Sequence, residues 1–362
     1  MQGHFVEIRG EIITLISVTV CVRDGIDWID DCLDSLINQT YSPLEIILVD
    51  DGSIDGSREK VSRWGEHELV TAIAQTAQGL SAGRMAALNE SKGEWVAITD
   101  IDVRPEPDWI ENLLKATEGE EAVAVTGRTV FGTGIDIVSK IRSVEIEAKY
   151  RSRPKNTTLA NGPCSMFKRD KLLEIGGFNP SWYHAEDMEV SLKLIEAGGR
   201  IIYTPDAVVN HVPEQGLMRF FNKRKRDARA HVRIVRKYKT KSDFLGSSWL
   251  VLSFIPVYFS MIFGLIWMMT DAPPVKELHL HPGLMMLVPL MIWYVLALNS
   301  NLKNAITSNK IKSTWVIAGW SLALWQGIIL GYVTAIDHST SSSASARFRR
   351  AMPAPIPTIL TA

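Results

Sequence analysis

The sequence predicts an α/β domain with a doubly wound sheet, followed by an all-α membrane region. Two observations support this fold class. In roughly the first 100 residues, short apolar segments alternate with segments of helical periodicity, which is typical of parallel strands covered by helices on both faces. After Ser247, three uncharged stretches are each close to the about 20 residues needed to span a bilayer. The length of 362 residues accommodates one domain of ordinary size and a smaller second part.

Apolar segments bounded by turn residues mark the first elements. Ile12–Val22 is rich in β-branched residues and uncharged, so it predicts a buried strand before the turn at Arg23-Asp24-Gly25. The segment from about Asp27 to Gln39 has helical periodicity. Further strands are expected over 44–49, 69–74 and 95–99, and a helix from about 79 to 88. This alternation predicts a doubly wound parallel sheet in the first part of the chain.

The following segments continue the α/β pattern. Helices are expected from about 108, over 136–150 and over 185–197, and strands over 122–130 and 201–203. Asn161-Gly162-Pro163 predicts a turn between two of these elements. We expect the whole α/β domain to span 1–214.

Three stretches of the C-terminal part predict transmembrane helices. They are about 249–269, 284–302 and 315–336, within a region of 247–338. A soluble helix of this length normally has a charged face, and these have none. Pro256 and Pro289 fall inside two of the stretches, which membrane helices tolerate.

The distribution of positive charge predicts the orientation of these helices. Directly before the first span, Gln215–Lys241 contains eleven Lys or Arg against one acid, Asp227. The lysines between the second and third spans are Lys303, Lys310 and Lys312, and Lys276 alone lies between the first and second. Because positive loops favour the cytoplasm, we expect a multi-pass membrane protein whose α/β domain is cytosolic.

The tail, 339–362, is then expected on the opposite face of the membrane. Its Ser/Ala-rich and Pro-rich composition predicts disorder. Three arginines in the tail, Arg347, Arg349 and Arg350, argue against the opposite face.

The basic stretch, 215–246, predicts an amphipathic segment on anionic headgroups. Apolar residues such as Phe220, Phe221 and Val232 are interleaved with its Lys and Arg. The alternative is the ordinary positive flank of a span, and the two are compatible. We expect no nucleic-acid partner, because 39 basic residues balance 40 acidic ones and the patch adjoins a span. The three cysteines show no CxxC spacing, which also favours a reducing compartment.

The strongest chemical signal is an Asp-x-Asp motif at the end of a predicted strand. Trp95–Thr99 runs directly into Asp100-Ile101-Asp102. Ligands of open α/β sheets bind beyond the carboxyl ends of the strands, where these carboxylates would lie. Two acids at this spacing could share a Mg²⁺ or Mn²⁺ ion that also contacts substrate phosphates. The alternative is a solvated loop, because Asp-x-Asp is common by chance.

Four motifs together carry a family resemblance. They are Val20-Cys21-Val22-Arg23-Asp24, Val49-Asp50-Asp51-Gly52-Ser53, Asp100-Ile101-Asp102 and Glu186-Asp187. With the segments GLSAGRMAALNESKGEW and GPCSMFKRDKLLEIGGFNP, their order and spacing resemble inverting family 2 glycosyltransferases of the GT-A fold. The resemblance covers roughly Ile12–Val212. It implies a doubly wound mixed sheet, a nucleotide-sugar donor, a divalent cation and inversion at the anomeric carbon.

The resemblance assigns the donor nucleotide to one group of residues. They are Val20, Val22, Asp24, Asp50, Asp51, Arg84 and Asp100. Asp50 and Asp51 would accept hydrogen bonds from the base and ribose, although a Gly-terminated turn with an Asx cap is the alternative. The family often has Asn after the Arg at position 84, and Met85 in this chain leaves a contact at that position open. A UDP-sugar is favoured and a GDP-sugar is possible.

The resemblance also implies residues for the metal. Asp102 would position the Mg²⁺ or Mn²⁺ ion, with Asp100 nearer the ribose or beside the metal. His211 would contact the metal or the diphosphate, or else serve as a structural histidine. A cation at this place would stabilise the charge that develops on the departing nucleoside diphosphate.

A direct displacement needs a base for the acceptor hydroxyl, and the resemblance assigns this role to Asp187 beside Glu186. The alternative is that both acids simply stabilise a helix N-terminus. If the acceptor is a lipid phosphate, it is already ionised and Asp187 would have another role.

The acceptor and diphosphate side is assigned to Gly162, Gln215 and Arg219. Gln215, Arg219 and Phe220 resemble the Gln-x-x-Arg-Trp element of processive synthases, but the spacing is one residue longer and Trp is absent. We therefore expect a membrane-bound transferase that moves a sugar to a lipid-linked acceptor, either a polyprenyl phosphate or a lipid-linked glycan. A processive polysaccharide synthase and a catalytically inactive membrane scaffold of the same fold are the alternatives.

Overall fold

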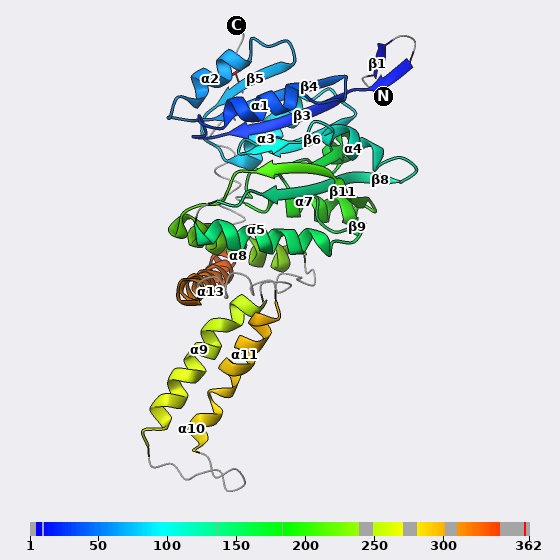
Figure 1. The fold of residues 1–362 in the computed structure, drawn as a ribbon. Helices are drawn as coiled ribbons and strands as arrows, with labels where there is room; N and C mark the ends of the chain where they lie inside the picture. Colours follow the sequence, from blue (N-terminus) through cyan, green and yellow to red (C-terminus); the bar gives the residue numbers. More distant parts are fainter. Residues whose placement is uncertain are drawn as a thin grey trace. The chain divides into compact units, whose positions relative to one another are not determined.

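The computed structural model of the 362-residue chain divides into two compact units (Figure 1). It describes residues 5–8, 11–134, 136–182, 184–238, 249–270, 281–300, 310–340 and 358–359. The first unit comprises Met1–Gly132, Tyr150–Val212 and Ser339–Ala362, and the second comprises Thr133–Lys149 and Pro213–His338. Each unit is described by itself.

A ten-stranded mixed sheet forms the centre of the first unit. Its order is β12-β5-β4-β3-β6-β10-β8-β11-β7, and β9 pairs with β11 at the side. Its strands are β3 (Ile16–Val22), β4 (Leu44–Asp51), β5 (Val70–Gln75), β6 (Trp95–Asp100), β7 (Val103–Pro105), β8 (Ala122–Phe131), β9 (Asn156–Thr157), β10 (Ser165–Lys168), β11 (Arg200–His211) and β12 (Thr358–Ile359). The neighbours β5-β4-β3-β6 run parallel, whereas β10 is antiparallel to both β6 and β8. The predicted doubly wound mixed sheet is thus confirmed.

Helices cover both faces of this sheet. They are α1 (Ile29–Ile37), α2 (Ser57–Trp64), α3 (Leu80–Glu90), α4 (Trp109–Lys115), α6 (Arg169–Glu174) and α7 (Glu186–Glu196). Alternate residues of β6 serve the two cores: Ala97 packs with the α1 and α4 residues, and Val96 and Ile98 pack with α3, α6 and α7. Each buried Val or Ile contributes about 1.5–3 kcal/mol. An uncharged strand is therefore required here, because either face would bury a charge.

Two expectations for this unit differ from the structure. The segment Ile12–Val22 forms two strands, because residues up to Thr14 belong to β2 (Glu11–Thr14), which pairs with β1 (Phe5–Ile8) in a separate sheet. The segment 201–203 is only the start of β11, which continues past Pro205 with a register shift between Tyr203 and Val208. Proline is tolerated at such an irregularity, which is why the apparent break does not end the strand.

The second unit is helical. It contains α5 (Ile137–Arg151) up to Lys149, α8 (Leu217–Tyr238), α9 (Trp249–Trp267), α10 (Pro282–Met285), α11 (Val288–Leu298) and α13 (Lys310–Thr340). Among the described residues, two helices are long and apolar enough to cross a membrane by length and composition alone, Trp249–Trp267 and Ile311–Val333. These two apolar helices are consistent with a membrane location.

The predicted second span is not one continuous helix. It is divided into α10 and α11, and Pro289 lies in the first turn of α11 rather than inside a helix. The 11 residues of α11 rise about 16 Å, roughly half of the hydrocarbon thickness. Pro256, by contrast, lies inside α9 as expected.

Some expectations concern parts of the chain outside the described residues. The end of the basic stretch after Tyr238, Lys276, Lys303 and most of the tail are of this kind. Within the described part of the tail, Ser339 and Thr340 end α13, and Thr358–Ile359 pair with Ala74 and Ile73 of β5.

Candidate active site

The acidic motifs gather at one edge of the sheet because their strands are parallel and in register. Val22 at the end of β3 pairs with Asp50 of β4, and Cys21 pairs with Asp100 of β6. The carboxyl ends of three neighbouring strands therefore meet at the same edge. This is where an open α/β sheet places its ligands.

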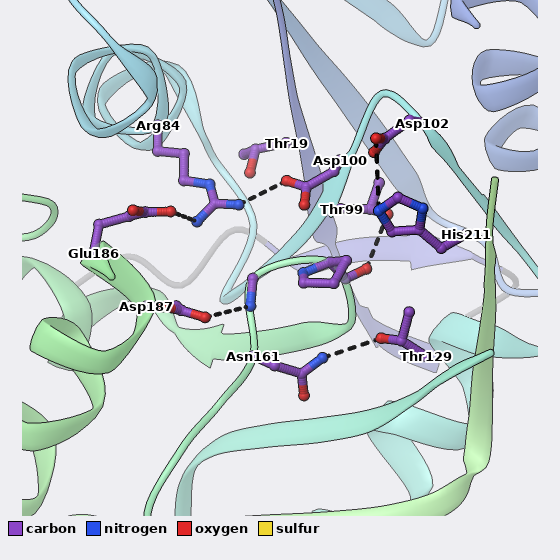
Figure 2. Close-up of polar contacts among 12 residues, drawn as sticks. Thr19, Arg84, Thr99, Asp100, Asp102, Thr129, Asn161, Glu186, Asp187 and His211 are labelled. Carbon is purple, nitrogen blue, oxygen red and sulfur yellow. Dashed lines mark hydrogen bonds and ion pairs between the residues drawn. The ribbon is translucent and has the colours of Figure 1, made fainter. Parts of the chain in front are cut away.

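Arg84 joins the end of β6 to the start of α7. Its Nη2 donates to Asp100 Oδ1 at 2.8 Å and its Nη1 donates to Glu186 Oε1 at 2.7 Å (Figure 2). The arginine side chain is only 3% exposed, so both carboxylates are needed to compensate its lost hydration. Burial lowers the pKa of Arg84, but Glu186 and Asp100 raise it on balance. Arg84, predicted to lie near the nucleotide, thus lies between two predicted site acids.

Glu186 is the buried member of the Glu-Asp pair. Burial raises its pKa to about 7, opposed by Arg84 and reinforced by the neighbouring Asp187. Glu186 therefore changes its charge near neutral pH.

This raised pKa predicts a pH dependence of stability. The folded protein binds the proton more tightly than the unfolded chain, where the pKa is 4.5, so Glu186 stabilises the fold below about pH 4.5. That contribution is lost as the pH rises through about 7. We expect the melting temperature to fall over this window and to fall less in the Glu186→Gln variant. Glu196→Gln, at the exposed end of the same helix, should keep the wild-type slope, and equal slopes in all three proteins would contradict the prediction.

Asp187 is held by backbone amides on both of its oxygens. Its Oδ2 accepts from Gly162 N at 3.0 Å, and its Oδ1 accepts from Met188 N at 2.8 Å. The residue lies in the first turn of α7, where the helix dipole favours acids. Its side chain is half-buried, so it remains accessible to a substrate while its orientation is fixed.

Gly162 brings its own loop against Arg84. A Cβ atom at this position would lie 2.8 Å from Arg84 Nη2 and 3.1 Å from Nη1. Because Arg84 is buried between two carboxylates, it has little room to move away. Next in the chain, Pro163 O accepts a hydrogen bond from Thr99 Oγ1 of β6 at 3.0 Å. The predicted turn at Asn161-Gly162-Pro163 thus lies between β6 and α7.

Arg153 holds this loop through three hydrogen bonds, and no sequence motif indicated it. Its guanidinium donates to Thr157 Oγ1 at 3.1 Å, to Leu159 O at 2.6 Å and to Asn161 Oδ1 at 3.1 Å. Asn161 Nδ2 in turn donates to Thr129 Oγ1 at 3.2 Å (Figure 2). The Asn-Gly-Pro turn was the only sequence signal for this network, and it gave no indication of Arg153.

Asp102 and His211 face each other, with 3.5 Å between Oδ2 and Nε2 (Figure 2). His211 Nδ1 lies 2.8 Å from Val212 O, and a carbonyl can only accept, so Nδ1 carries the hydrogen. In the neutral ring, Nε2 then directs a lone pair towards Asp102. The ring of Phe131 stacks on His211 with 4.3 Å between centroids, which fixes the ring plane.

This pair fits a cation that substrate oxygens complete. With 3.5 Å between them, Asp102 Oδ2 and His211 Nε2 would be able to hold one Mg²⁺ or Mn²⁺ ion together. Two facing acceptor atoms repel unless a cation or a proton lies between them. The described residues contain no group of three or more His, Cys, Asp or Glu that could hold a metal by itself. Magnesium sites of one or two protein ligands plus phosphates have this composition.

The remaining predicted donor residues are engaged with the protein. Asp50 is fully buried and accepts from Arg58 Nε at 3.0 Å and from Ser53 N. Asp51 accepts from Gln75 Nε2 and from two backbone amides, those of Gln78 and Gly79. Both therefore anchor loops at the sheet edge. These contacts agree with the alternative of a Gly-terminated turn with an Asx cap.

Asp24, Val20 and Val22 lie on or just after β3. Asp24 is exposed, and its Oδ1 accepts from Ile54 N at 2.9 Å. The side chains of Val20 and Val22 are buried in the sheet core. Gln215 and Arg219 are exposed residues of the second unit. Gln215 lies just before α8, and Arg219 lies in its first turn.

The sheet is a GT-A-like mixed sheet, and these acids lie at its carboxyl edge. Residues 17–176 match the sequence model of Glycosyl transferase family 2. The chain therefore contains a family 2 glycosyltransferase domain, as its motifs predicted.

Similar proteins agree with this class. The chain is 27% identical over 218 residues to the glucosyl-dolichyl phosphate glucuronosyltransferase of Haloferax volcanii, covering 54% of this chain and 68% of that protein. It is 33% identical over 161 residues to the putative glycosyltransferase EpsH of Bacillus subtilis, covering 43% of this chain and 46% of that protein. The chain thus spans less than half of the length of EpsH.

The solved structure of the mannosyltransferase PcManGT from Pyrobaculum calidifontis, in complex with GDP-Man and Mn²⁺, has a similar fold. The TM-score is 0.55 at 22% sequence identity, over 89% of this chain and 86% of that one. At this identity the likeness concerns the fold alone.

Proposed function

We propose that this enzyme transfers one sugar from a nucleotide-sugar to a lipid-linked acceptor, with inversion at the anomeric carbon. The carrying observation is that Arg84 joins Asp100, of the donor motif, to Glu186, of the acceptor motif. Asp187 follows Glu186 and is held by Gly162, which itself lies against Arg84. Residues far apart in sequence thus converge on one site that suits a direct displacement.

The divalent ion is expected between Asp102 and His211. Their separation and the tautomer of His211 support this placement. When bound, Mg²⁺ or Mn²⁺ stabilises the negative charge of the departing nucleoside diphosphate. Mn²⁺ in the similar PcManGT structure is consistent with this. Val212 links the two residues. Its N–H donates to Asp102 O at 3.0 Å, and its carbonyl oxygen lies 2.8 Å from His211 Nδ1.

Asp187 takes the proton of the acceptor hydroxyl. The acceptor oxygen forms its bond to the anomeric carbon as the bond from that carbon to the phosphate oxygen breaks, and the proton moves to Asp187 Oδ. The amides of Gly162 and Met188 keep the carboxylate in one orientation during this step. A phosphate acceptor is already ionised and needs no base, so Asp187 would then have another role.

A lipid-linked acceptor is supported by two observations. The Haloferax volcanii relative carries dolichyl phosphate in its name. In the second unit, α9 and α11 expose large apolar side chains, among them Phe259, Phe263 and Met291. An enzyme attached to a bilayer by these helices meets acceptors that are themselves embedded in it. UDP-sugars are favoured as donors and GDP-sugars are possible.

A processive polysaccharide synthase is the second candidate. The chain is 29% identical over 191 residues to the chondroitin synthase of Pasteurella multocida, but it spans only 19% of that protein. The incomplete Gln215–Phe220 element makes polymerisation the less favoured reaction.

The fate of labelled sugar tests the proposal. Membranes containing the enzyme are incubated with radiolabelled UDP- and GDP-sugars and Mn²⁺, with EDTA-treated membranes as the control. We expect metal-dependent transfer of label into the organic-solvent phase. Label in a long water-soluble polymer would indicate the synthase, and no transfer from any donor would contradict both.

A further inference from the structure

The helix α9 and the consecutive helices α10 and α11 form an antiparallel apolar hairpin, called the α9–α11 hairpin. Trp293 Nε1 donates to Leu250 O at 2.8 Å near one end, and Ser260 Oγ donates to Met286 O at 3.3 Å further along. Close to the other end, Gly264 and Gly283 bring the two backbones into contact. Away from this interface, Phe263 and Ile292 are more than half exposed. The described helices of this hairpin present hydrocarbon to their surroundings, as a membrane-inserted segment does.

The helix α13 crosses this hairpin rather than joining it. Its contacts with α9 are close to one point, where Trp325 Nε1 donates to Leu252 O at 2.9 Å and Ser321 Oγ accepts from Ile255 N at 3.3 Å. Figure 1 shows α13 nearly end-on while α9 and α11 run along the page. Helices crossing this steeply cannot both stand upright in one bilayer.

The partner along the length of α13 is the basic helix α8. Three glycines of α13 lie against successive turns of α8: Gly319 against Phe221, Gly327 against Lys225 O, and Gly331 against Val232. Further on, Arg236 donates from Nη1 to Tyr332 O at 2.9 Å. The two helices therefore run side by side and in the same direction. The 22 residues of α8 include nine Lys or Arg and one acid.

A spanning α13 would carry this charged neighbour into the hydrocarbon. Basic side chains are costly at membrane depth unless they reach the interface or a polar partner. The length and composition of α13 permit a span, but its packing opposes one. In the most apolar 18-residue segment of α13, 44% of the residues are buried, whereas 22% are buried in the corresponding segment of α9.

We propose that α8 and α13 lie together along the surface of an anionic bilayer, and that only the α9–α11 hairpin enters it. The exposed apolar residues of α13 support this arrangement. Ile311, Trp315, Leu322, Ile329 and Val333 follow one another at spacings of four and seven, so they form one stripe. Such a stripe suits the headgroup–acyl boundary, and the basic residues of α8 suit the anionic headgroups.

The C-terminal strand supports the same arrangement independently. Thr358 and Ile359 pair with β5 of the first unit, which contains the candidate active site and is called the catalytic unit here. This pairing requires the tail to be on the same side of the membrane as that unit, the catalytic side. A hairpin returns the chain to that side, whereas three spans would place the tail opposite. Arg347, Arg349 and Arg350 agree with the catalytic side as well.

Cysteine accessibility tests this inference. Single Ser339→Cys and Glu66→Cys variants in sealed membrane vesicles are treated with a membrane-impermeant maleimide, before and after detergent. Glu66, exposed in the catalytic unit, defines the catalytic side. We expect Ser339→Cys to be labelled whenever Glu66→Cys is. The natural thiols give low background, because burial raises the pKa of Cys21, Cys32 and Cys164 to about 12.

Spin-label depth provides the second measurement. Nitroxides at Leu322→Cys and Phe263→Cys, both exposed positions, are compared in phosphatidylcholine vesicles containing phosphatidylglycerol. We expect the label on α13 to be shallow and the label on α9 to be deep. Labelling of Ser339→Cys only from the opposite side, or equal depth at both positions, would overturn the inference. Neither readout uses a sugar donor, so failure here is distinguishable from failure of the proposed transfer, on whose membrane attachment the inference rests.

Discussion

Replacing Asp187 by asparagine is expected to lower kcat by about 10²–10⁴-fold, because the acceptor hydroxyl loses its base. Asparagine has nearly the same shape, and its amide oxygen can still accept from Gly162 N, so the loop should keep its position. The KM for the donor should change little, since Asp187 is on the acceptor side. Initial rates over a range of donor concentrations measure both quantities.

The matched control is Glu196→Gln at the exposed end of the same helix, which should keep wild-type activity. Full activity of Asp187→Asn with a hydroxyl acceptor would remove the base from the mechanism. A large loss of melting temperature in Asp187→Asn would instead assign Asp187 a structural role.

Replacing Asp102 by asparagine should weaken metal-dependent donor binding by on the order of 100-fold or more. Loss of residues that merely support metal ligands already costs 10–100-fold. Asparagine keeps the volume but removes the charge that faces His211 Nε2 at 3.5 Å. Calorimetric titration of the corresponding nucleoside diphosphate, with and without Mn²⁺, measures the effect.

Asp206→Asn is the control for this variant, because Asp206 is an exposed acid on β11, the strand that ends in His211. It should bind the nucleotide like the wild type. If Asp102→Asn retains the full Mn²⁺ dependence of binding, the ion is not held by the Asp102–His211 pair.

The sequence was sufficient for the strands and for the acids at their ends. The uncharged segment Trp95–Thr99 determines a buried strand, and parallel topology then determines where Asp100 lies. In contrast, the helix α2 was not expected, because its sequence has few apolar positions. In the structure only Ser57 and Val61 of this helix are buried. A mostly solvent-exposed helix leaves little trace in hydrophobic periodicity.

Side-chain partners across the fold were beyond the reach of the sequence. Arg84 and Glu186 are 102 positions apart, and nothing local to either residue indicates that they meet. Arg153 and its partners are only four to eight positions apart, yet no motif marks this arginine. Apolar composition likewise identified α13 as a candidate span but carried no information about its packing against α8, which depends on the position of three glycines.

Arg84 lies among carboxylates that carry more negative charge than its guanidinium balances. Asp100 and Glu186 pair with Arg84, and Asp187 is held beside them by Gly162, so carboxylates outnumber this guanidinium and disfavour a bare diphosphate. We therefore expect a nucleotide-sugar to enter as its complex with the divalent ion. Raising the ionic strength at fixed metal concentration should then lower the association rate of the donor only slightly. In an enzyme whose positive site attracts the free anion, the same change would lower that rate more.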